Sequence, residues 1–404
     1  MKILVLNSGS ATQKTSLYEI VAEPSADPPA PLWEGLIEWD ATDAAIRTTG
    51  PAGVRLQNRV PIVSRRKVTE QLLSDLWTGG APLLTGPAEI EIVGHRIVHG
   101  GEEYSEPAFV TSALKDVVRR MIEFAPLHNP AGLEGIEIIE QILGSVPQVA
   151  VFDTAFHRRL PEAAAVYPGP YEWIARGIRR YGFHGINHQY VAQRAARLLG
   201  RDLRSLKLVT CHLGNGCSLA AVRDGRSVDT TMGFTPLEGL MMGTRSGSID
   251  PGILTYLLRR DNLTAEQLDD LLNKKSGLAG ISGISNDMRQ IVSAMNAGNP
   301  RAKLAFDIFI HRLTSLIGSM VAVLGGVDAL VFTAGIGENS AEVRAATCAN
   351  LEFLGISLDP SKNSQPACDA DISTVDSRVR VLMVRANEDW AIACDCWRLA
   401  RTHS

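Results

Sequence analysis

The densest group of residues that could do chemistry lies between Cys211 and Asp250. HLGNG at 212–216 follows an apolar run, 206–211, that is typical of a buried strand. Asn and Gly permit backbone conformations in which several N–H groups converge, and such a turn can bind an anion. GLMMGTRSG at 239–247 places Arg245 between glycines, where a guanidinium points into a cleft rather than packing in a core. Together, the anion-binding turn and the arginine indicate phosphoryl transfer.

These motifs must be positioned by strands and turns, and the pattern of strands occurs twice. SLAAVRDGRSVDTT, at 218–231, predicts a hairpin whose turn is Asp224-Gly225. Near the start of the chain, SGSATQ (8–13) joins two strand-like runs, with Lys14 at its exit. A strand, a phosphate turn and a second strand near residue 9 and again near residue 214 predict two similar α/β halves with a cleft between them.

Two further charged residues sit on strand-like runs. VPQVAVFDTAFH at 146–157 is a buried strand that ends at Asp153, and IEIVGHRIVHGG at 90–101 carries Arg96. Open α/β sheets place functional groups at the carboxyl ends of their strands. The plainer interpretations are that Arg96 is a structural ion-pair partner and that His184 is a buried core histidine.

The remaining segments alternate between helical and strand-like patterns. Residues 41–65 are weakly patterned, and 277–291 predicts a glycine-rich loop that enters a helix. The run 329–344 predicts a strand, a glycine turn and a helix with a capping box of Asn339 and Glu342. Helices are expected at 66–77, 112–124, 132–143, 188–199, 251–260, 264–273, 302–324 and 389–402, and further strands at 32–39 and 378–390.

Length and charge limit the possibilities further. The chain has 404 residues, which fits two domains, and a net charge of −4 without a Lys/Arg block. Nucleic acid and an anionic membrane are therefore not expected as partners. The apolar start ends at Asn7, too early for a signal peptide, and the run 316–324 is too short to span a bilayer. Six scattered cysteines predict reduced thiols and a cytoplasmic protein.

Ten motifs in order resemble the acetokinase (acetate kinase) family, within the acetate and sugar kinase, Hsp70 and actin superfamily. They are NSGSATQK at 7–14, GHRIVHGG at 94–101, PLHNP at 126–130, FDTAFH at 152–157, RRYGFHG at 179–185, HLGNG at 212–216, GLMMGTRSG at 239–247, GISGISNDMR at 280–289, FTAGIGENS at 332–340 and RANEDW at 385–390. Only about 21–89 and 355–378 are weakly covered.

The resemblance implies a duplicated fold of two actin-like (ribonuclease H-like) domains with an active-site cleft between them. We expect one domain at 1–153 plus about 385–404, where the C-terminal helix returns, and the other at 154–384. A homodimer is also expected from the resemblance alone.

The implied reaction is reversible phosphoryl transfer from ATP to acetate, giving ADP and acetyl phosphate, with Mg²⁺, or Mn²⁺ in its place. Carried over by motif, the catalytic residues are Asp153, His184 and Arg245, and the metal ligands are Asn7 and Glu388. Acetate would bind to Arg96 and an apolar pocket of Val98, Leu127, Phe183 and Pro236. The nucleotide would bind to Lys14, His212, Leu213, Gly214, Asn215, Gly216, Asp287, Met288, Arg289, Gly335, Ile336, Gly337, Glu338 and Asn339.

The acceptor in this reaction is itself a carboxylate, with an ordinary pKa of about 4–5, so it is already ionised at neutral pH. No general base is needed in this direction. We therefore predict that Asp153 orients Arg96 or Arg245, or fixes a metal-bound water, rather than taking a proton.

The chain departs from the usual family pattern at Ala11, Gln13, Ile186, Asn187 and Ser248. None of these departures removes a charged catalytic group. A propionate or other short-chain acyl kinase remains an alternative, because one methylene changes selectivity by only about 1–3 kcal/mol. A nucleotide-driven, non-enzymatic protein like actin or Hsp70 is the second alternative.

Overall fold

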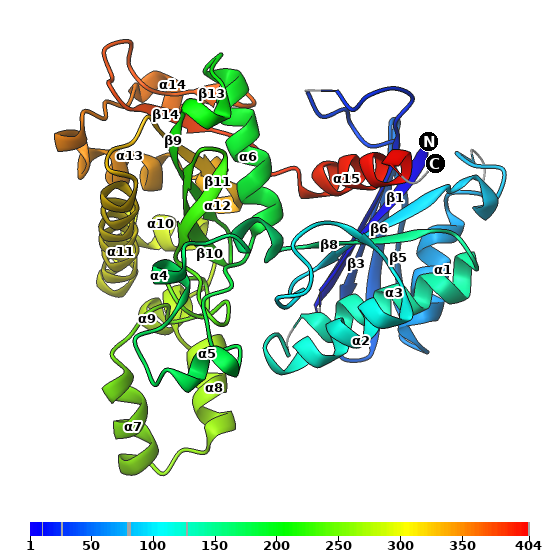
Figure 1. Cartoon of the computed structure of the whole chain (residues 1–404), viewed down its shortest axis with the longest axis horizontal. Coiled ribbons are helices and arrows are strands. Elements are labelled where there is room, and N and C mark those ends of the chain that lie inside the picture. Colours follow the sequence, from blue (N-terminus) through cyan, green and yellow to red (C-terminus); the bar gives the residue numbers. More distant parts are fainter. Residues whose placement is uncertain (10, 26, 79–81, 127, 403–404) are drawn as a thin grey trace. The chain divides into compact units, whose positions relative to one another are not determined.

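The computed structural model describes residues 1–9, 11–25, 27–78, 82–126 and 128–402, and it divides into two compact units. Unit 1 consists of Met1–Ala155 and Asn387–Ser404, and unit 2 consists of Phe156–Ala386. The chain therefore leaves unit 1, builds the whole of unit 2, and returns to unit 1 at its end (Figure 1).

Unit 1 is built on a sheet with the strand order β5-β4-β3-β2-β1-β6-β8-β7. Strands β1, β6 and β8 are parallel neighbours, while β2 to β5 follow as antiparallel neighbours on the other side of β1. The strands are β1 Lys2–Ser8, β2 Thr12–Glu19, β3 Trp33–Trp39, β4 Asp43–Gly50, β5 Gly53–Pro61, β6 Ile92–Ile97, β7 Ala108–Phe109 and β8 Gln148–Phe152.

Helices cover both faces of this sheet. The α-helices in the described part of this unit are α1 Arg65–Ser74, α2 Ser112–Arg120, α3 Asn129–Leu143 and α15 Glu388–Thr402. Side chains alternate along β6, so Val93 packs in a core that includes Ile139 of α3, while Gly94 faces α15. A Cβ at Gly94 would lie 2.6 Å from Ile392 and 2.7 Å from the sulfur of Cys396, so glycine lets α15 approach β6 closely.

Unit 2 repeats this arrangement with the strand order β11-β10-β9-β12-β14-β13. Strands β9, β12 and β14 are parallel, as β1, β6 and β8 are, and β10 and β11 follow β9 antiparallel, as β2 and β3 follow β1. The duplication predicted from the two phosphate turns is therefore confirmed. The strands are β9 Lys207–Leu213, β10 Cys217–Arg223, β11 Arg226–Thr230, β12 Ala329–Thr333, β13 Ala370–Asp371 and β14 Arg380–Met383.

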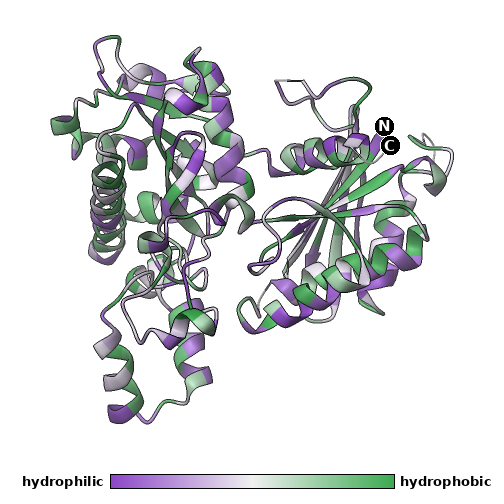
Figure 2. Ribbon diagram, in the orientation of Figure 1, coloured by the Kyte–Doolittle hydropathy of each residue, from purple (hydrophilic) through white to green (hydrophobic). Residues whose placement is uncertain are grey.

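The main helices packed on the sheet of unit 2 are α6 Gly185–Leu198, α11 Pro300–Leu324 and α12 Ala334–Asn339, and α13 Ala341–Ala349 packs against α11 and α12. The others are α4 Glu162–Ala165, α5 Glu172–Ala175, α7 Pro251–Arg260, α8 Ala265–Lys274, α9 Gly277–Ser282, α10 Met288–Asn296 and α14 Pro360–Ser364. In Figure 2, hydrophobic residues predominate along central strands such as β1 and β8, whereas most helices carry both hydrophilic and hydrophobic residues.

The sequence predicted no segment long enough to span a bilayer. Helix α11 corrects this expectation, because by length and composition it could cross a membrane. The run 316–324 is only its last part. Asn299 caps the start of α11, since its side chain accepts hydrogen bonds from the N–H groups of Arg301 and Ala302, and Gly325 ends it with φ 64°. The helix packs against β9, β10 and β11 and against α9, α10 and α13, and this packing accounts for its apolar residues.

Several local predictions are confirmed. Asp224 and Gly225 have φ 54° and 73°, as the predicted hairpin turn requires. The helices predicted at 251–260 and 264–273 are α7 and α8, and α8 begins after Thr264, which forms a capping box with Gln267.

Other local predictions were wrong. Residues 41–65 contain the β4–β5 hairpin, which is hard to recognise in the sequence because Ile46 is the one large apolar residue among the inward positions Ala44, Ile46 and Thr48 of β4. Segment 277–291 begins with the short helix α9 instead of a loop, and 334–339 is the helix α12 instead of a glycine turn. The cap of α13 is Ser340, whose hydroxyl accepts from the N–H of Val343, so Asn339 and Glu342 do not form the predicted capping box.

Candidate active site

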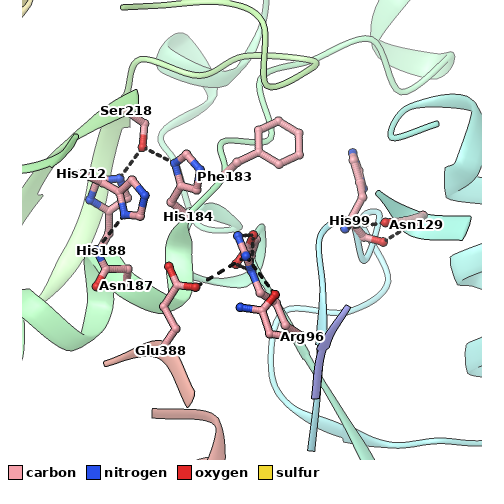
Figure 3. Close-up of polar contacts among 12 residues, drawn as sticks. Arg96, His99, Asn129, Phe183, His184, Asn187, His188, His212, Ser218 and Glu388 are labelled. Atoms are coloured by element: carbon pink, nitrogen blue, oxygen red, sulfur yellow. Dashed lines mark hydrogen bonds and ion pairs between the residues drawn. The ribbon is translucent and has the colours of Figure 1, made fainter. Parts of the chain in front are cut away.

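In unit 1, the predicted residues meet where the three parallel strands end. Asn7 lies at the end of β1, Arg96 near the end of β6, and Asp153 directly after β8. The carboxyl ends of parallel strands share one edge of a sheet, so their side chains gather there. Glu388, the first residue of α15, joins them from the returning chain (Figure 3).

Arg96 and Asp153 form a two-pronged ion pair. Nε of Arg96 donates to Oδ2 of Asp153 at 3.0 Å, and Nη2 donates to the same oxygen at 2.6 Å. Burial raises the pKa of Asp153 to about 6, although the neighbouring guanidinium opposes this shift. Burial alone would lower the pKa of Arg96, but Asp153 and Glu388 raise it above its usual value. Near neutral pH, the pair is therefore ionised.

Asn7 and Glu388 provide oxygen atoms that converge on the other side of Arg96. Nη1 of Arg96 donates to Oδ1 of Asn7 at 3.2 Å and lies 3.6 Å from Oε2 of Glu388. One amide oxygen and one carboxylate fit Mg²⁺, which prefers hard oxygen ligands, keeps several waters and is usually completed by substrate phosphates. No group of three or more His, Cys, Asp or Glu with metal-ligand geometry occurs among the described residues.

The remaining predicted residues of unit 1 are less closely involved. Lys14 lies in β2 directly opposite Asn7, and it attracts the buried carboxylate of Asp389, which accepts a hydrogen bond from Ser16. Val98 follows β6 and is half-buried. Leu127 lies outside the described residues.

In unit 2, the start of α6 presents three polar side chains on one face. His184 caps the helix, and Asn187 and His188 follow three and four residues later, so all three point toward β9 and β10. His184 has φ 57°, a left-handed conformation that is uncommon outside glycine. Nε2 of the buried His157 lies 3.1 Å from the carbonyl oxygen of Phe183, which precedes this strained residue.

The sheet register brings further partners to this face. Ser218 of β10 pairs with His212 of β9. Nδ1 of His184 lies 2.9 Å from the hydroxyl of Ser218, and the His184 ring stacks on the His212 ring at 4.0 Å between centroids (Figure 3). Asn187 contacts Nδ1 of His212 at 2.8 Å, so the departure at this position acts on His212.

Arg245 is a half-buried cation of unit 2 that approaches the same turn as His184. It has no ion-pair partner within the described ranges, and its Nη1 donates to the carbonyl oxygen of Pro236 at 3.2 Å. Burial lowers its pKa, which is the cost of holding a charge without an acidic neighbour. A Cβ at Gly216 would lie 3.4 Å from Nε2 of His184 and 3.6 Å from Nη1 of Arg245. The two side chains therefore approach the same turn.

A cavity of about 750 Å³ opens beside this turn, within the size range of ligand pockets. Eight residues predicted for the nucleotide site line it: Gly214, Asn215, Asp287, Met288, Arg289, Gly335, Ile336 and Asn339.

Five other predicted residues do not line this cavity: His212, Leu213, Gly216, Gly337 and Glu338. Leu213 is fully buried in the core, and Glu338 accepts a hydrogen bond from the N–H of Ala386. Sequence reasoning did not assign four lining residues: Asn286 and Ser340 lie within the motifs at 280–289 and 332–340, and Val292 and Glu342 follow just after them. It also missed Ser218, whose only signal is its register opposite His212.

Comparison with known proteins agrees with this geometry. The model of the Acetokinase family matches residues 2–394. The chain belongs to the acetokinase family. It is 59% identical to the acetate kinase of Cyanothece sp., over all of both chains. It is 40% identical to the acetate kinase of Porphyromonas gingivalis, whose crystal structure matches with a TM-score of 0.91 over 99% of each chain.

Another solved member of similar likeness is a propionate kinase from Francisella tularensis. It is 38% identical, with a TM-score of 0.90 over 98% of this chain and 99% of its own. These acetokinase-family structures confirm the predicted duplicated, actin-like fold.

Proposed function

We propose that this chain transfers a phosphoryl group reversibly between ATP and acetate. The full-length likeness to acetate kinases carries this proposal. Supporting it, unit 1 holds a guanidinium beside two oxygen ligands, and unit 2 holds a half-buried arginine next to a nucleotide-sized cavity.

Arg96 binds the carboxylate of acetate in this proposal. Asp153 takes up Nε and one N–H of Nη2, and Nη1 contacts Asn7 and Glu388, so acetate binds in this proposal to the remaining N–H groups of Nη1 and Nη2. Asp153 fixes that orientation and takes no proton. Arg245 and His184 neutralise the negative charge that spreads over the transferring phosphoryl group.

Asn7 and Glu388 hold Mg²⁺ in this proposal, and the ion supplies charge neutralisation for the phosphates. Binding must displace the contact of Glu388 with Arg96.

We expect EDTA to abolish activity and Mg²⁺ to restore it, with Glu388→Gln needing at least about tenfold more Mg²⁺ for half-maximal rate. Equal Mg²⁺ requirements of variant and wild type would remove Glu388 from the metal site.

The test of the activity is to trap acyl phosphate as hydroxamate with ATP and Mg²⁺, in parallel with acetate, propionate, butyrate and no acid. We expect acetate to give the most product. Arg245→Ala should lower the rate about 10³- to 10⁵-fold, as the loss of other phosphoryl-binding arginines does. Arg398→Ala is the matched control, because Arg398 pairs with Asp395 on the surface of α15.

Propionate is the second candidate acceptor, because a propionate kinase is nearly as similar in structure. More product with propionate than with acetate would keep the mechanism and change the substrate. ATP hydrolysis without acyl phosphate from any acid would favour a nucleotide-driven protein instead.

The chain also forms a homodimer in this proposal. Helix α7 has no buried residue although it carries Ile253, Tyr256 and Leu258, and such an exposed apolar face suits an interface. Light scattering that shows monomers at micromolar concentration would contradict it. A cytoplasmic location is proposed because all six cysteines are free thiols.

A further inference from the structure

Four side chains of unit 2 form a continuous series of hydrogen bonds, which we call the histidine chain: His184, Ser218, His188 and Thr210. Nδ1 of His184 lies 2.9 Å from Oγ of Ser218, and the same oxygen lies 2.7 Å from Nε2 of His188. Nδ1 of His188 lies 2.7 Å from Oγ1 of Thr210, which in turn lies 3.4 Å from the carbonyl oxygen of Ala220.

The carbonyl oxygen of Ala220 gives the direction that we assign to the far end of the histidine chain. A carbonyl oxygen can only accept, so Thr210 donates its single hydroxyl proton to Ala220. Thr210 must then accept from an N–H at Nδ1 of His188. Burial lowers the pKa of His188 well below its usual value, so this ring is neutral and its Nε2 carries only a lone pair.

Counting donors and acceptors in the same way assigns the proton at the His184 end of the histidine chain. Ser218 has one hydroxyl proton, and the lone pair on Nε2 of His188 requires it. The oxygen of Ser218 therefore accepts from an N–H at Nδ1 of His184. Every group in the histidine chain thus donates away from His184 and toward the backbone of β10.

We propose that Ser218 and His188 are positioning residues for the phosphoryl transfer, which keep a proton on Nδ1 of His184 and thereby direct its Nε2 toward the Gly216 turn. This inference rests on the proposed function. Nε2 then donates to a phosphoryl oxygen only when the His184 ring carries a second proton. Ser218 favours that cation, because a hydroxyl that donates to His188 becomes a stronger acceptor for His184.

A purely structural role makes a different prediction. The histidine chain would then only satisfy buried polar atoms, and breaking it would cost stability without moving the proton of His184. The position of that proton is therefore the decisive readout.

The experiment uses full-length protein labelled with ¹⁵N-histidine, whose two-bond ¹H–¹⁵N spectra distinguish an Nδ1–H ring from an Nε2–H ring. His184→Gln identifies the His184 signals. We expect Nδ1–H for neutral His184 in the wild type and a shift toward Nε2–H in Ser218→Ala. Ser218→Thr keeps the hydroxyl and should keep the wild-type pattern.

Ser227→Ala is the matched control, because Ser227 is also a buried hydroxyl on this sheet but contacts His157 at 2.7 Å. It should leave the His184 signals unchanged. His188→Phe removes the nitrogen that accepts the hydrogen bond from Ser218. In His188→Gln, the amide oxygen of the new side chain can accept that hydrogen bond instead. This second pair tests the proposal if Ser218→Ala does not fold.

Kinetics give an independent readout. We expect Ser218→Ala and His188→Phe to lower kcat about 10- to 100-fold, with KM values for ATP and acetate changed less than about threefold. An Nδ1–H ring retained in both variants, or a raised KM at unchanged kcat, would overturn the proposal. If the wild type forms no acyl phosphate, the proposed function fails, while the spectra still report the tautomer on their own.

Discussion

At the scale of single residues, Asp153 determines what Arg96 can still bind. Its carboxylate takes up the Nε edge of the guanidinium, where hydrogen bonds of 2.6 and 3.0 Å reach one oxygen. Arginine binds carboxylates best through two parallel hydrogen bonds, so a substrate must use the Nη1–Nη2 end. Losing Asp153 would leave Arg96 free to turn and to bind in more than one way.

The raised pKa of Asp153 leads to a prediction about pH. The ionised form holds Arg96, and it is lost as pH falls through about 6, whereas acetate itself remains ionised there. We expect kcat/KM for acetate to fall below pH 6, approaching about tenfold per pH unit. Asp153→Asn should be slower at pH 7 and nearly flat from pH 7 to 5. A variant profile that falls as the wild type does would assign the step to another group.

Sequence could predict these polar residues and the pairing of Asp153 with an arginine, but not the geometry of the contacts. Arg96, Asp153, Asn7 and Glu388 were identified by motif, and the position of three of them at strand ends follows from the parallel sheet. The two-pronged pair between Arg96 and Asp153 depends on side-chain rotamers, which strand periodicity does not specify. The contacts of Ser218 could not be predicted from the sequence either, because they depend on the register of β9 and β10.

At the scale of elements, the turn between β9 and β10 separates His184 from Arg245. Gly216 does not have a positive φ, so alanine fits its backbone. The added methyl group would lie 3.4 Å from the His184 ring and 3.6 Å from Arg245, within the space that both side chains face. Glycine is thus needed for room rather than for backbone freedom.

We therefore predict that Gly216→Ala lowers kcat about 100-fold, the effect expected of a displacement of about 1 Å in reacting groups. Stability should not fall, and it could rise by about 0.4–1 kcal/mol, because alanine restricts the unfolded chain. Steady-state kinetics and urea unfolding measure the two effects. Lost stability with normal activity would mean that the turn has no part in the site.

Elements were predicted well where local signals are strong and poorly where tertiary packing decides. The Asp224-Gly225 turn and the helix at 264–273 depend on local signals, and both were predicted. Strand β4 has small inward residues, and its alternation is recognisable only beside β3 and β5. Helix α12 contains Gly335 and Gly337, which weaken helical propensity, yet tertiary contacts form it.

At the scale of the whole molecule, unit 1 is assembled from two separate parts of the chain. Helix α15 packs on β1 and β6, and Gly94 provides the space for it. Glu388 reaches Arg96 only because α15 begins at that sheet edge. Packing of this helix therefore supports both the stability of unit 1 and its cluster of charged residues.

We predict that Gly94→Ala destabilises unit 1 by about 1–3 kcal/mol, because the new methyl group overlaps Ile392 and Cys396. Tryptophan fluorescence during urea unfolding reports mainly on this unit, which holds all tryptophans except Trp173. Gly318→Ala is the control: nothing lies within 4 Å of its added methyl, and in α11 it should stabilise by about 0.5–1 kcal/mol. Equal effects of both changes would mean that α15 does not pack tightly on β6.

The divided construction of unit 1 also sets an order of events on the ribosome. Residues 1–155 emerge first, but residues 387–402 are translated only after the whole of unit 2. Unit 2 is continuous and can complete its sheet as it emerges, whereas the sheet face around Gly94 waits for α15. Unit 1 is therefore synthesised first but completes its fold last. Until α15 packs on the sheet, the exposed apolar face of unit 1 can be bound by chaperones.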